Sequence, residues 1–222
     1  MLNTTAEQRH ALQIFAVATI SLMVSSLMLA PLQAVELING AHSPLVDALI
    51  SGVTNLGDGV IILPIFIFLL FKRVYWAMGL LFNGILQGGV VSLCKRILFP
   101  HALRPINFLD HDTIHIISEV KIHKLMSFPS GHTVTAFGIF IFIALYLNNR
   151  GASWMLMIAA TLVAISRVYL LQHFLWDVAA GAVIGSAIGM FAFFVSQNIV
   201  KPKWMYQRLE VAFRDRSRSS WS

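Results

Sequence analysis

The sequence predicts an all-α membrane protein with six transmembrane helices in a bundle. Apolar residues make up 57% of its 222 residues and charged residues only 12%, and the mean hydropathy is +0.75. A water-soluble domain is normally far less apolar. Apolar runs close to the roughly 20 residues that cross a bilayer occur six times along the chain. One membrane domain over residues 1–200 would therefore use nearly the whole sequence.

The six expected helices lie between charged positions. In order they span about residues 10–30, 46–71, 74–94, 130–147, 154–171 and 177–198. The first has a longer apolar core than a secretory signal and no plainly basic leader, so we expect it to be retained. In the sixth, Gly181, Gly185 and Gly189 recur every fourth residue, which allows a neighbouring helix to approach closely.

The second expected helix is interrupted by polar residues and glycines at positions 55–59. The clean apolar stretch that follows is too short to cross a bilayer alone, so this span is predicted to be bent or partly interfacial. Asp58 is expected to cap the break, with contact to a substrate as the alternative.

Positive charges indicate the orientation. Six crossings place both termini on one side, and the tail 201–222 carries six basic residues, whereas the loop 31–45 carries none. Basic residues concentrate on the cytoplasmic side of membrane proteins. We therefore expect an inner (plasma) membrane protein with cytoplasmic termini, and with the loops 31–45, 95–129 and 172–176 facing the periplasm or exterior. Trp76, Trp154 and Trp204 at inner ends and Trp176 at an outer end are expected in the aromatic belts.

The net charge of +6 is scattered over connectors and the tail, so a nucleic-acid partner is not expected. The basic tail is instead expected to contact anionic lipid. Cys94 is the single cysteine, which excludes an internal disulfide framework. The oligomeric state is not predicted.

Several cations remain on the outer side, where the orientation rule does not explain them. They are Lys95, Arg96, Arg104, Lys121 and Lys124, with Arg167 near the outer end of the fifth helix. An ionisable side chain in the apolar zone is costly, and by default it indicates a functional site with a partner. An anionic ligand would supply that partner.

Two short segments supply chemistry beside these cations. The fourth helix begins at Pro129-Ser130-Gly131-His132, and unpaired amides at a helix N-terminus favour phosphate. His173 and Asp177 are four residues apart, a spacing that can bring the carboxylate to one ring nitrogen and leave the other free to attack.

Together these pieces resemble the three-part signature of the type-2 phosphatidic acid phosphatase superfamily, which includes vanadium-dependent haloperoxidases. The signature here is Lys95 with Arg104-Pro105, then Pro129-Ser130-Gly131-His132, then Ser166-Arg167 with His173 and Asp177. The first part departs from the pattern, because eight residues instead of six separate Lys95 from Arg104-Pro105. Either the loop carries a two-residue bulge or Arg96 takes part. The expected orientation, assigned from charge and hydropathy, brings all three parts to the outer face.

The resemblance implies a metal-independent phosphatase with a histidine nucleophile and no cofactor. His173 would attack phosphorus, Asp177 would orient it, and His132 would protonate the leaving oxygen. The phosphate would be held by a second group of residues: Lys95, Arg104, Ser130, Gly131 and Arg167.

The implied substrate is a membrane lipid that carries a phosphate or diphosphate, such as polyprenyl diphosphate, phosphatidic acid, phosphatidylglycerol phosphate or lipid A. A binding or transport protein without hydrolysis and a lipid-to-lipid phosphotransferase are the alternatives, and a haloperoxidase is not expected with six spans. A metal site in the loop that contains His111 and His115 is a weaker alternative to contact with lipid headgroups or to simple solvation of an amphipathic turn at the membrane surface.

Overall fold

The computed structural model describes residues 4–110, 112, 114–117, 120–199 and 202–206, and within this part of the chain it contains helices, turns and coil but no strand. The α-helices are α1 (Ala6–Met28), α2 (Pro31–Asn39), α3 (Pro44–Val53), α4 (Ile62–Lys72), α5 (Val74–Leu93), α6 (Gly131–Leu147), α7 (Arg150–Tyr169) and α8 (Leu175–Asn198). Shorter turns are the 3₁₀ segments Thr54–Gly57, Gly59–Ile61, Pro105–Asn107 and Lys203–Tyr206 and the π-helical turn Cys94–Leu98.

Helix α6 forms the centre of the bundle. Eleven of its 17 residues are buried, and it contacts α8, α7, α5 and α1. Its contact with α8 is the most extensive and depends on glycine: a Cβ atom on Gly185 would lie 2.4 Å from the Val134 carbonyl oxygen, and one on Gly189 would lie 2.3 Å from the Gly138 carbonyl oxygen. The predicted role of these glycines in close helix packing is confirmed.

A helix is present at the place of each predicted span. Four are long and apolar enough to cross a membrane by themselves: α1, α5 with its π-helical extension to Leu98, α7 and α8. The segments Pro44–Gly57 and Gly59–Lys72 make a fifth candidate, bent by 61°. The bend confirms the predicted interruption, and Asp58 caps it by accepting a hydrogen bond from the Val60 amide at 3.1 Å. With its 17 residues, α6 is shorter than the usual span, so the sixth crossing stays a prediction.

One helix was not predicted. Residues 31–39 were expected to lie in a loop, but they form α2, which starts with a proline at its first position. Asn39 at its end donates hydrogen bonds to the carbonyl oxygens of Tyr169 at 3.0 Å and His115 at 2.8 Å. Helix α2 therefore connects the end of α7 to the long loop before α6.

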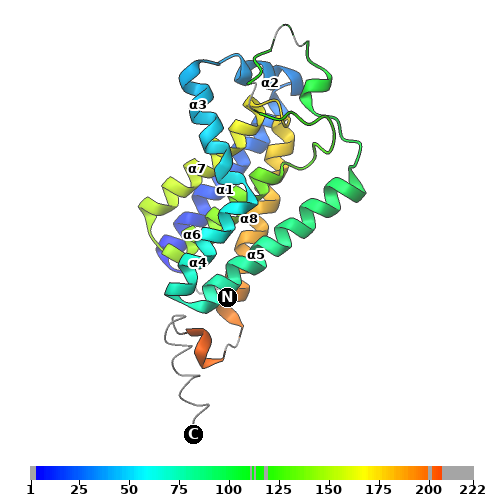
Figure 1. The fold of residues 1–222 in the computed structure, drawn as a ribbon. Coiled ribbons are helices and arrows are strands. Elements are labelled where there is room, and N and C mark those ends of the chain that lie inside the picture. The colour runs from blue at the N-terminus through cyan, green and yellow to red at the C-terminus, as the bar shows by residue number, and fades with distance from the viewer. Residues whose placement is uncertain (1–3, 111, 113, 118–119, 200–201, 207–222) are drawn as a thin grey trace.

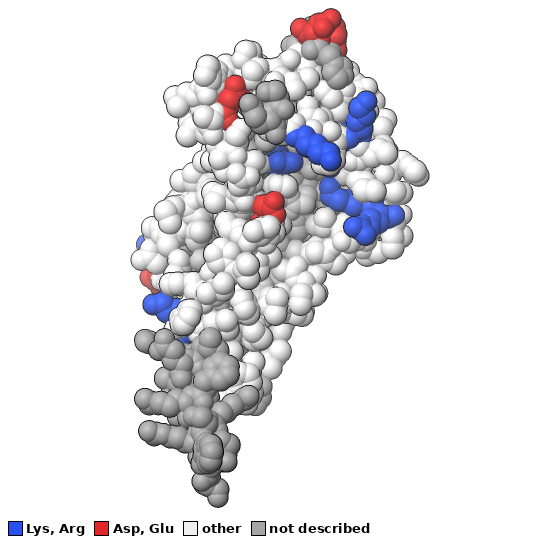
Figure 2. Space-filling model, viewed as in Figure 1, with Lys and Arg blue, Asp and Glu red and all other residues white. Residues whose placement is uncertain are grey.

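The two ends of the bundle differ. Thr5, before α1, is hydrogen-bonded to Asn148 in the α6–α7 turn, and the rings of Tyr75 and Tyr206 lie 5.5 Å apart. The start of α1 and the end of α8 thus lie at one end of the bundle, and α2 and α3 lie at the other (Figure 1). In the space-filling view, Lys and Arg gather at both ends of this face, and the zone between them is largely uncharged (Figure 2). An apolar band between two charged ends is what a membrane-spanning bundle requires.

Trp76 was predicted to lie in an aromatic belt, but the structure does not place it there. Its side chain is buried, and it packs against the rings of Phe142, Tyr146 and Phe193. Its position near the start of α5 is at the depth expected of an interfacial residue, but it lies on the face of the helix that points into the bundle. Trp154 and Trp176 are about half exposed, as expected for belt residues.

Candidate active site

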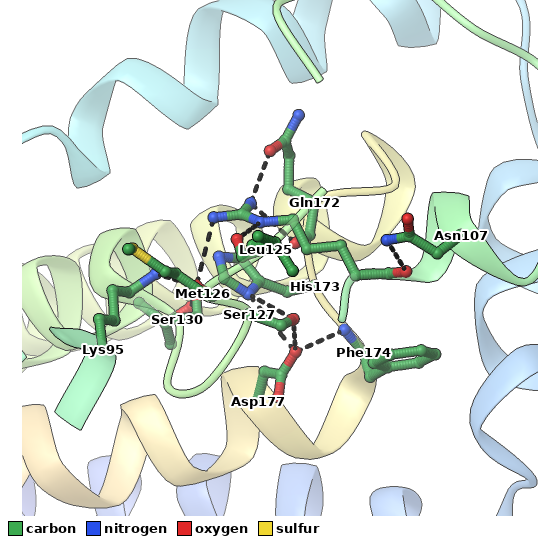
Figure 3. A network of polar contacts seen from close by, with 12 residues as sticks. Lys95, Asn107, Leu125, Met126, Ser127, Ser130, Gln172, His173, Phe174 and Asp177 are labelled. Atoms are coloured by element: carbon green, nitrogen blue, oxygen red, sulfur yellow. Dashed lines mark hydrogen bonds and ion pairs between the residues drawn. The ribbon is translucent and has the colours of Figure 1, made fainter. Parts of the chain in front are cut away.

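A buried polar cluster joins the start of α8 to the loop before α6. His173 Nδ1 lies 3.4 Å from Asp177 Oδ2 and 3.5 Å from Ser127 Oγ. The Ser127 hydroxyl donates a hydrogen bond to the same Asp177 oxygen (Figure 3). All three side chains are at most 2% exposed. Since Nδ1 faces Asp177 and Ser127, the Nε2 atom of His173 is the ring nitrogen left to react.

The first turn of α8 fixes the carboxylate. The Phe174 amide donates a hydrogen bond to Asp177 Oδ2 at 3.0 Å. Asp177 lies in the first turn of the helix, where negative charge is favoured. The backbone carbonyl of Asp177 accepts a hydrogen bond from the Ser130 amide at 3.1 Å. The beginning of α8 is thereby joined to the beginning of α6, so two of the three signature segments are held by one residue.

His173 is surrounded by positive charge. Burial lowers the pKa of its imidazole well below the ordinary value, and Arg104, Lys95, Arg167 and His132 lower this pKa further. These residues must therefore lie within electrostatic range of the ring. A depressed pKa keeps the imidazole neutral at neutral pH, the form in which a nitrogen lone pair can attack.

Arg104 is held almost entirely by backbone oxygens and one amide side chain. Its Nη1 atom donates to the Gln172 carbonyl oxygen at 2.9 Å and to Gln172 Oε1 at 2.7 Å, and its Nε atom donates to the Leu125 carbonyl oxygen at 2.8 Å. Burial lowers the pKa of this guanidinium, whereas the nearby Asp177 opposes that shift. Gln172 also donates to the Lys121 carbonyl oxygen at 3.1 Å, so it connects the long loop to the segment that carries His173.

The first signature segment begins in an irregular helical turn. Lys95 lies in the π-helical turn Cys94–Leu98, a wide turn that accommodates an additional residue within a helix. Its Nζ atom donates to the Met126 carbonyl oxygen at 2.8 Å, while the neighbouring Arg96 is exposed. Of the two candidate cations, Lys95 is therefore the one directed toward His173.

Arg167 approaches from α7. Its Nη1 atom donates to Thr54 Oγ1 at 2.7 Å, and its side chain is 8% exposed. Its Nε atom is buried and has no hydrogen-bond partner in the part of the chain that the structure describes. A buried guanidinium with an unsatisfied donor has the chemistry to bind an anion.

The N-terminus of α6 supplies the uncharged part of the cluster. Ser130 is fully buried at the N-cap position and accepts a hydrogen bond from Thr133 Oγ1 at 2.9 Å. No side chain caps the first amides of the helix at Gly131 and His132. A helix start of this kind favours an anion because its amides and its dipole are both positive.

A cavity of about 150 Å³ lies beside His132. Its walls come from the break between α3 and α4, from α5 and from the first turns of α6, and include Asp58, Gln87 and His132. Gly57 permits this arrangement, since a Cβ atom there would lie 2.9 Å from the His132 carbonyl oxygen and 2.6 Å from Val163 Cγ1. Asp58 therefore both caps the break and lines a cavity with His132.

The histidine-rich loop makes a separate contact. His115 Nε2 lies 2.9 Å from Asp47 Oδ2, and its ring stacks on that of His42 at 4.2 Å. His111, the other half of the weaker metal-site alternative, lies outside the described residues. Among those that are described, no group of three or more His, Cys, Asp or Glu side chains has a metal-binding arrangement.

Sequence reasoning missed three residues that hold the cluster together: Ser127, Gln172 and Thr54. Each adjoins a recognised segment or the glycine-rich break, so its position in the chain was a usable signal. Its partner, however, is far away in sequence: Ser127 and Asp177 are 50 residues apart, and Thr54 and Arg167 are 113 apart. Only the folded chain shows these pairs.

This architecture defines an apolar helical-bundle protein with a group of cationic side chains around a buried histidine–carboxylate pair. The chain belongs to the PAP2 superfamily, whose family model matches residues 76–201. With its apolar helices, this membership indicates a multi-pass membrane protein.

Known relatives are membrane lipid phosphatases. Lipid A 4'-phosphatase of Bacteroides thetaiotaomicron is 27% identical over 168 residues, which cover 72% of this chain and 74% of that protein. Undecaprenyl-diphosphatase BcrC of Bacillus subtilis is 27% identical over 163 residues, which cover 72% of this chain and 80% of that protein. The crystal structure of Aquifex aeolicus LpxE superposes with a TM-score of 0.62 at 29% identity and covers 71% of this chain and 91% of that chain.

Proposed function

We propose that this protein hydrolyses a phosphate monoester or diphosphate of a membrane lipid through a phosphohistidine at His173, without a metal ion. The observation that carries the proposal is the buried His173–Asp177–Ser127 cluster, in which Nδ1 is engaged and Nε2 is left beside several cations. Membership of a family whose relatives include lipid phosphatases supports the substrate class.

In the first step, His173 Nε2 forms a bond to phosphorus while the bond from phosphorus to the lipid oxygen breaks. His132 gives its proton to the departing oxygen. In the second step, His132 takes a proton from water, the water oxygen attacks phosphorus, and the bond to His173 breaks to release inorganic phosphate. Asp177 stabilises the positive charge that develops on the imidazole.

The phosphate would be held by Lys95, Arg104, Arg167, Ser130 and the Gly131 amide. Phosphoryl transfer depends mainly on positioning and on stabilising charge on the equatorial oxygens. Buried guanidinium groups and a helix N-terminus supply both, so no step of this scheme requires a metal ion.

We further propose that residues 1–200 cross an inner membrane six times, with a cytoplasmic basic tail at 201–222 and the site at the periplasmic or exterior face. The charge distribution of the sequence supports this orientation, as does the location of Thr5, Asn148 and Tyr206 at the end opposite α2 and α3.

Transfer of the phosphate to a second lipid would use the same first step, with a lipid hydroxyl in place of water. A protein that only binds or transports phospholipid would need the cations but not the Ser127–Asp177–His173 alignment. That alignment favours an enzyme that transfers the phosphate over a protein that only binds or transports the lipid.

The test uses purified protein in detergent with a panel of phosphorylated lipids, with and without a chelator. Phosphate release is expected to survive chelation and to fall at least about 10³-fold in His173→Ala. His101→Ala, which changes an exposed histidine of the same loop region, serves as the matched control. Acid-labile radiolabelled phosphate should be trapped on the wild-type protein and be absent from the variant. Turnover by His173→Ala at the wild-type rate would refute the proposal.

A further inference from the structure

Asp58 is a carboxylate placed beside the start of α6. The residue before it, Gly57, packs so closely on His132 that a Cβ atom added to the glycine would lie 2.9 Å from His132 Cβ. The 3₁₀ segment that ends at Gly57 contacts both α6 and α7. Asp58 itself is exposed. An ionisable side chain in a segment predicted to cross a membrane indicates by default a function that involves a partner.

The fold uses only part of this carboxylate. Its Oδ1 atom accepts the capping hydrogen bond from the Val60 amide at 3.1 Å. Among the described residues it makes no second hydrogen bond and no ion pair, so its Oδ2 atom is free. A neutral serine or asparagine would cap the turn equally well. The cap therefore does not account for the negative charge.

His132 shares a cavity with this charge. Both residues line the cavity of about 150 Å³ described above, and the other residues that line it are glycines, Gln87, Val91 and Thr135, all uncharged. A partly polar cavity of this volume has room for water. A hydrogen-bonded water molecule can therefore link Asp58 Oδ2 to the imidazole.

Apart from Asp58, the charged groups that act on the His132 imidazole are cations. They are Lys95 after α5, Arg104 in the long loop and Arg167 on α7. Three positive charges oppose an imidazolium, which is the form that a proton donor must have. Asp58 is the carboxylate, within the part of the chain that the structure describes, whose charge favours the imidazolium.

We propose that Asp58 is a positioning residue for the proton donor: its carboxylate stabilises the protonated His132 that gives its proton to the leaving oxygen. The inference rests on the proposed function, because it concerns the proton transfer of the first step. Asp58 then serves His132 as Asp177 serves His173, with one carboxylate for each histidine. The same charge favours the return of a proton from water to His132 in the second step.

The experiment compares kcat/KM for two phosphate monoesters in detergent. Dodecyl phosphate loses an alkoxide, which needs a proton, whereas a dodecyl-substituted p-nitrophenyl phosphate loses a stable phenolate, which does not. Asp58→Asn keeps an acceptor for the Val60 amide and removes the charge. It is expected to lower kcat/KM about tenfold on the alkyl substrate and less than about twofold on the aryl substrate. Asp58→Ser, which also keeps a cap, should give the same pattern.

Two further variants serve as references. Glu36→Gln removes an exposed carboxylate from α2 and should change neither rate. His132→Ala should lower kcat/KM on the alkyl substrate at least about 10²-fold. Adding Asp58→Asn to His132→Ala should cause no further loss, because Asp58 acts through His132.

Equal losses on both substrates in Asp58→Asn would show that the carboxylate supports the fold or binds the phosphate, and would overturn the inference. Unchanged rates on both substrates would do the same, as would a further loss in the His132→Ala background. None of these results touches the proposed function, which fails instead if His173→Ala releases phosphate from both substrates at the wild-type rate.

Discussion

Two residues beside the candidate site have left-handed backbone conformations although neither is glycine. Met126 has φ 57° and Leu171 has φ 58°. This conformation is costly for a bulky side chain and persists only where the surrounding structure enforces it. The carbonyl of Met126 accepts hydrogen bonds from Lys95 and Arg104, and Leu171 precedes Gln172, which binds Arg104. One strained residue thus directs its own carbonyl oxygen toward the cations, and the other directly precedes a residue that binds Arg104.

The residues proposed to react and to bind phosphate could be predicted from short motifs, because their types and spacing are local features of the chain. The structure brings Ser130, Asp177 and His173 together by direct hydrogen bonds or close contacts. Ser127 and Gln172 could not be predicted in the same way, since an unremarkable serine or glutamine acquires its role only from distant partners.

Ser127→Ala should lower kcat about fivefold and leave KM nearly unchanged. The substitution removes one of the hydrogen bonds that orient the Asp177 carboxylate toward His173, and a positioning bond of this kind contributes about 1 kcal/mol. Steady-state kinetics on the preferred lipid measures the effect. Ser92→Ala, on an exposed position of α5, is the control. A KM increase with unchanged kcat would place Ser127 in substrate binding instead.

Lys95→Gln should move the acidic limb of the pH–rate profile to higher pH. Nearby positive charge lowers the pKa of His173, so removing one charge raises that pKa toward its ordinary value. The imidazole is then protonated and unreactive at a higher pH than in the wild type. The profile of kcat/KM reports this shift separately from the expected loss of affinity. An unchanged limb would mean that His173 does not set it.

At the scale of helices, apolar runs predicted where the helices lie in the chain, but they did not predict which face of a helix packs against its neighbours. Each predicted span contains a helix because the bilayer imposes length and composition on the sequence. Helix α2 was not predicted, because it is short and amphipathic and therefore contains no long apolar run. Trp76 was assigned to the interface because hydropathy gives depth but not the direction in which a helix face points.

Gly185→Ala should destabilise the bundle by about 2 kcal/mol, because the added methyl would lie 2.4 Å from the Val134 carbonyl oxygen and force α6 and α8 apart. Thermal unfolding in detergent, followed by helical circular dichroism, measures the change. Gly89→Ala is the matched control on α5, since its Cβ would meet nothing within 4 Å. Comparable midpoints for the two variants would contradict the packing role.

For the whole molecule, the proposed orientation rests on the charge distribution of the sequence. Among the described helices, the start of α1 and the end of α8 lie at the end of the bundle opposite α2 and α3. The number of crossings depends on α6, whose burial by four other helices removes the need for a full-length apolar surface. Hydropathy alone cannot distinguish such a sheltered helix from a lipid-facing one.

Membrane-impermeant maleimide labelling tests the orientation. In a Cys94→Ala background, a cysteine at His101 should react from outside intact cells, whereas a cysteine at Arg150 should react only after permeabilisation. Both positions are exposed, so access depends on the side of the membrane. The reverse pattern would invert the proposed topology and put the site in the cytoplasm.

The shortness of α6 has a consequence for how a substrate would arrive. Its 17 residues rise about 25 Å, whereas the hydrocarbon layer is about 30 Å thick. If its inner end lies at the cytoplasmic boundary, the start of the helix next to Ser130 is recessed about 5 Å beneath the outer boundary of the hydrocarbon layer. A lipid phosphate would have to sink into the protein to be bound, shedding its bulk hydration on the way. Water for the second step would then have to follow it down.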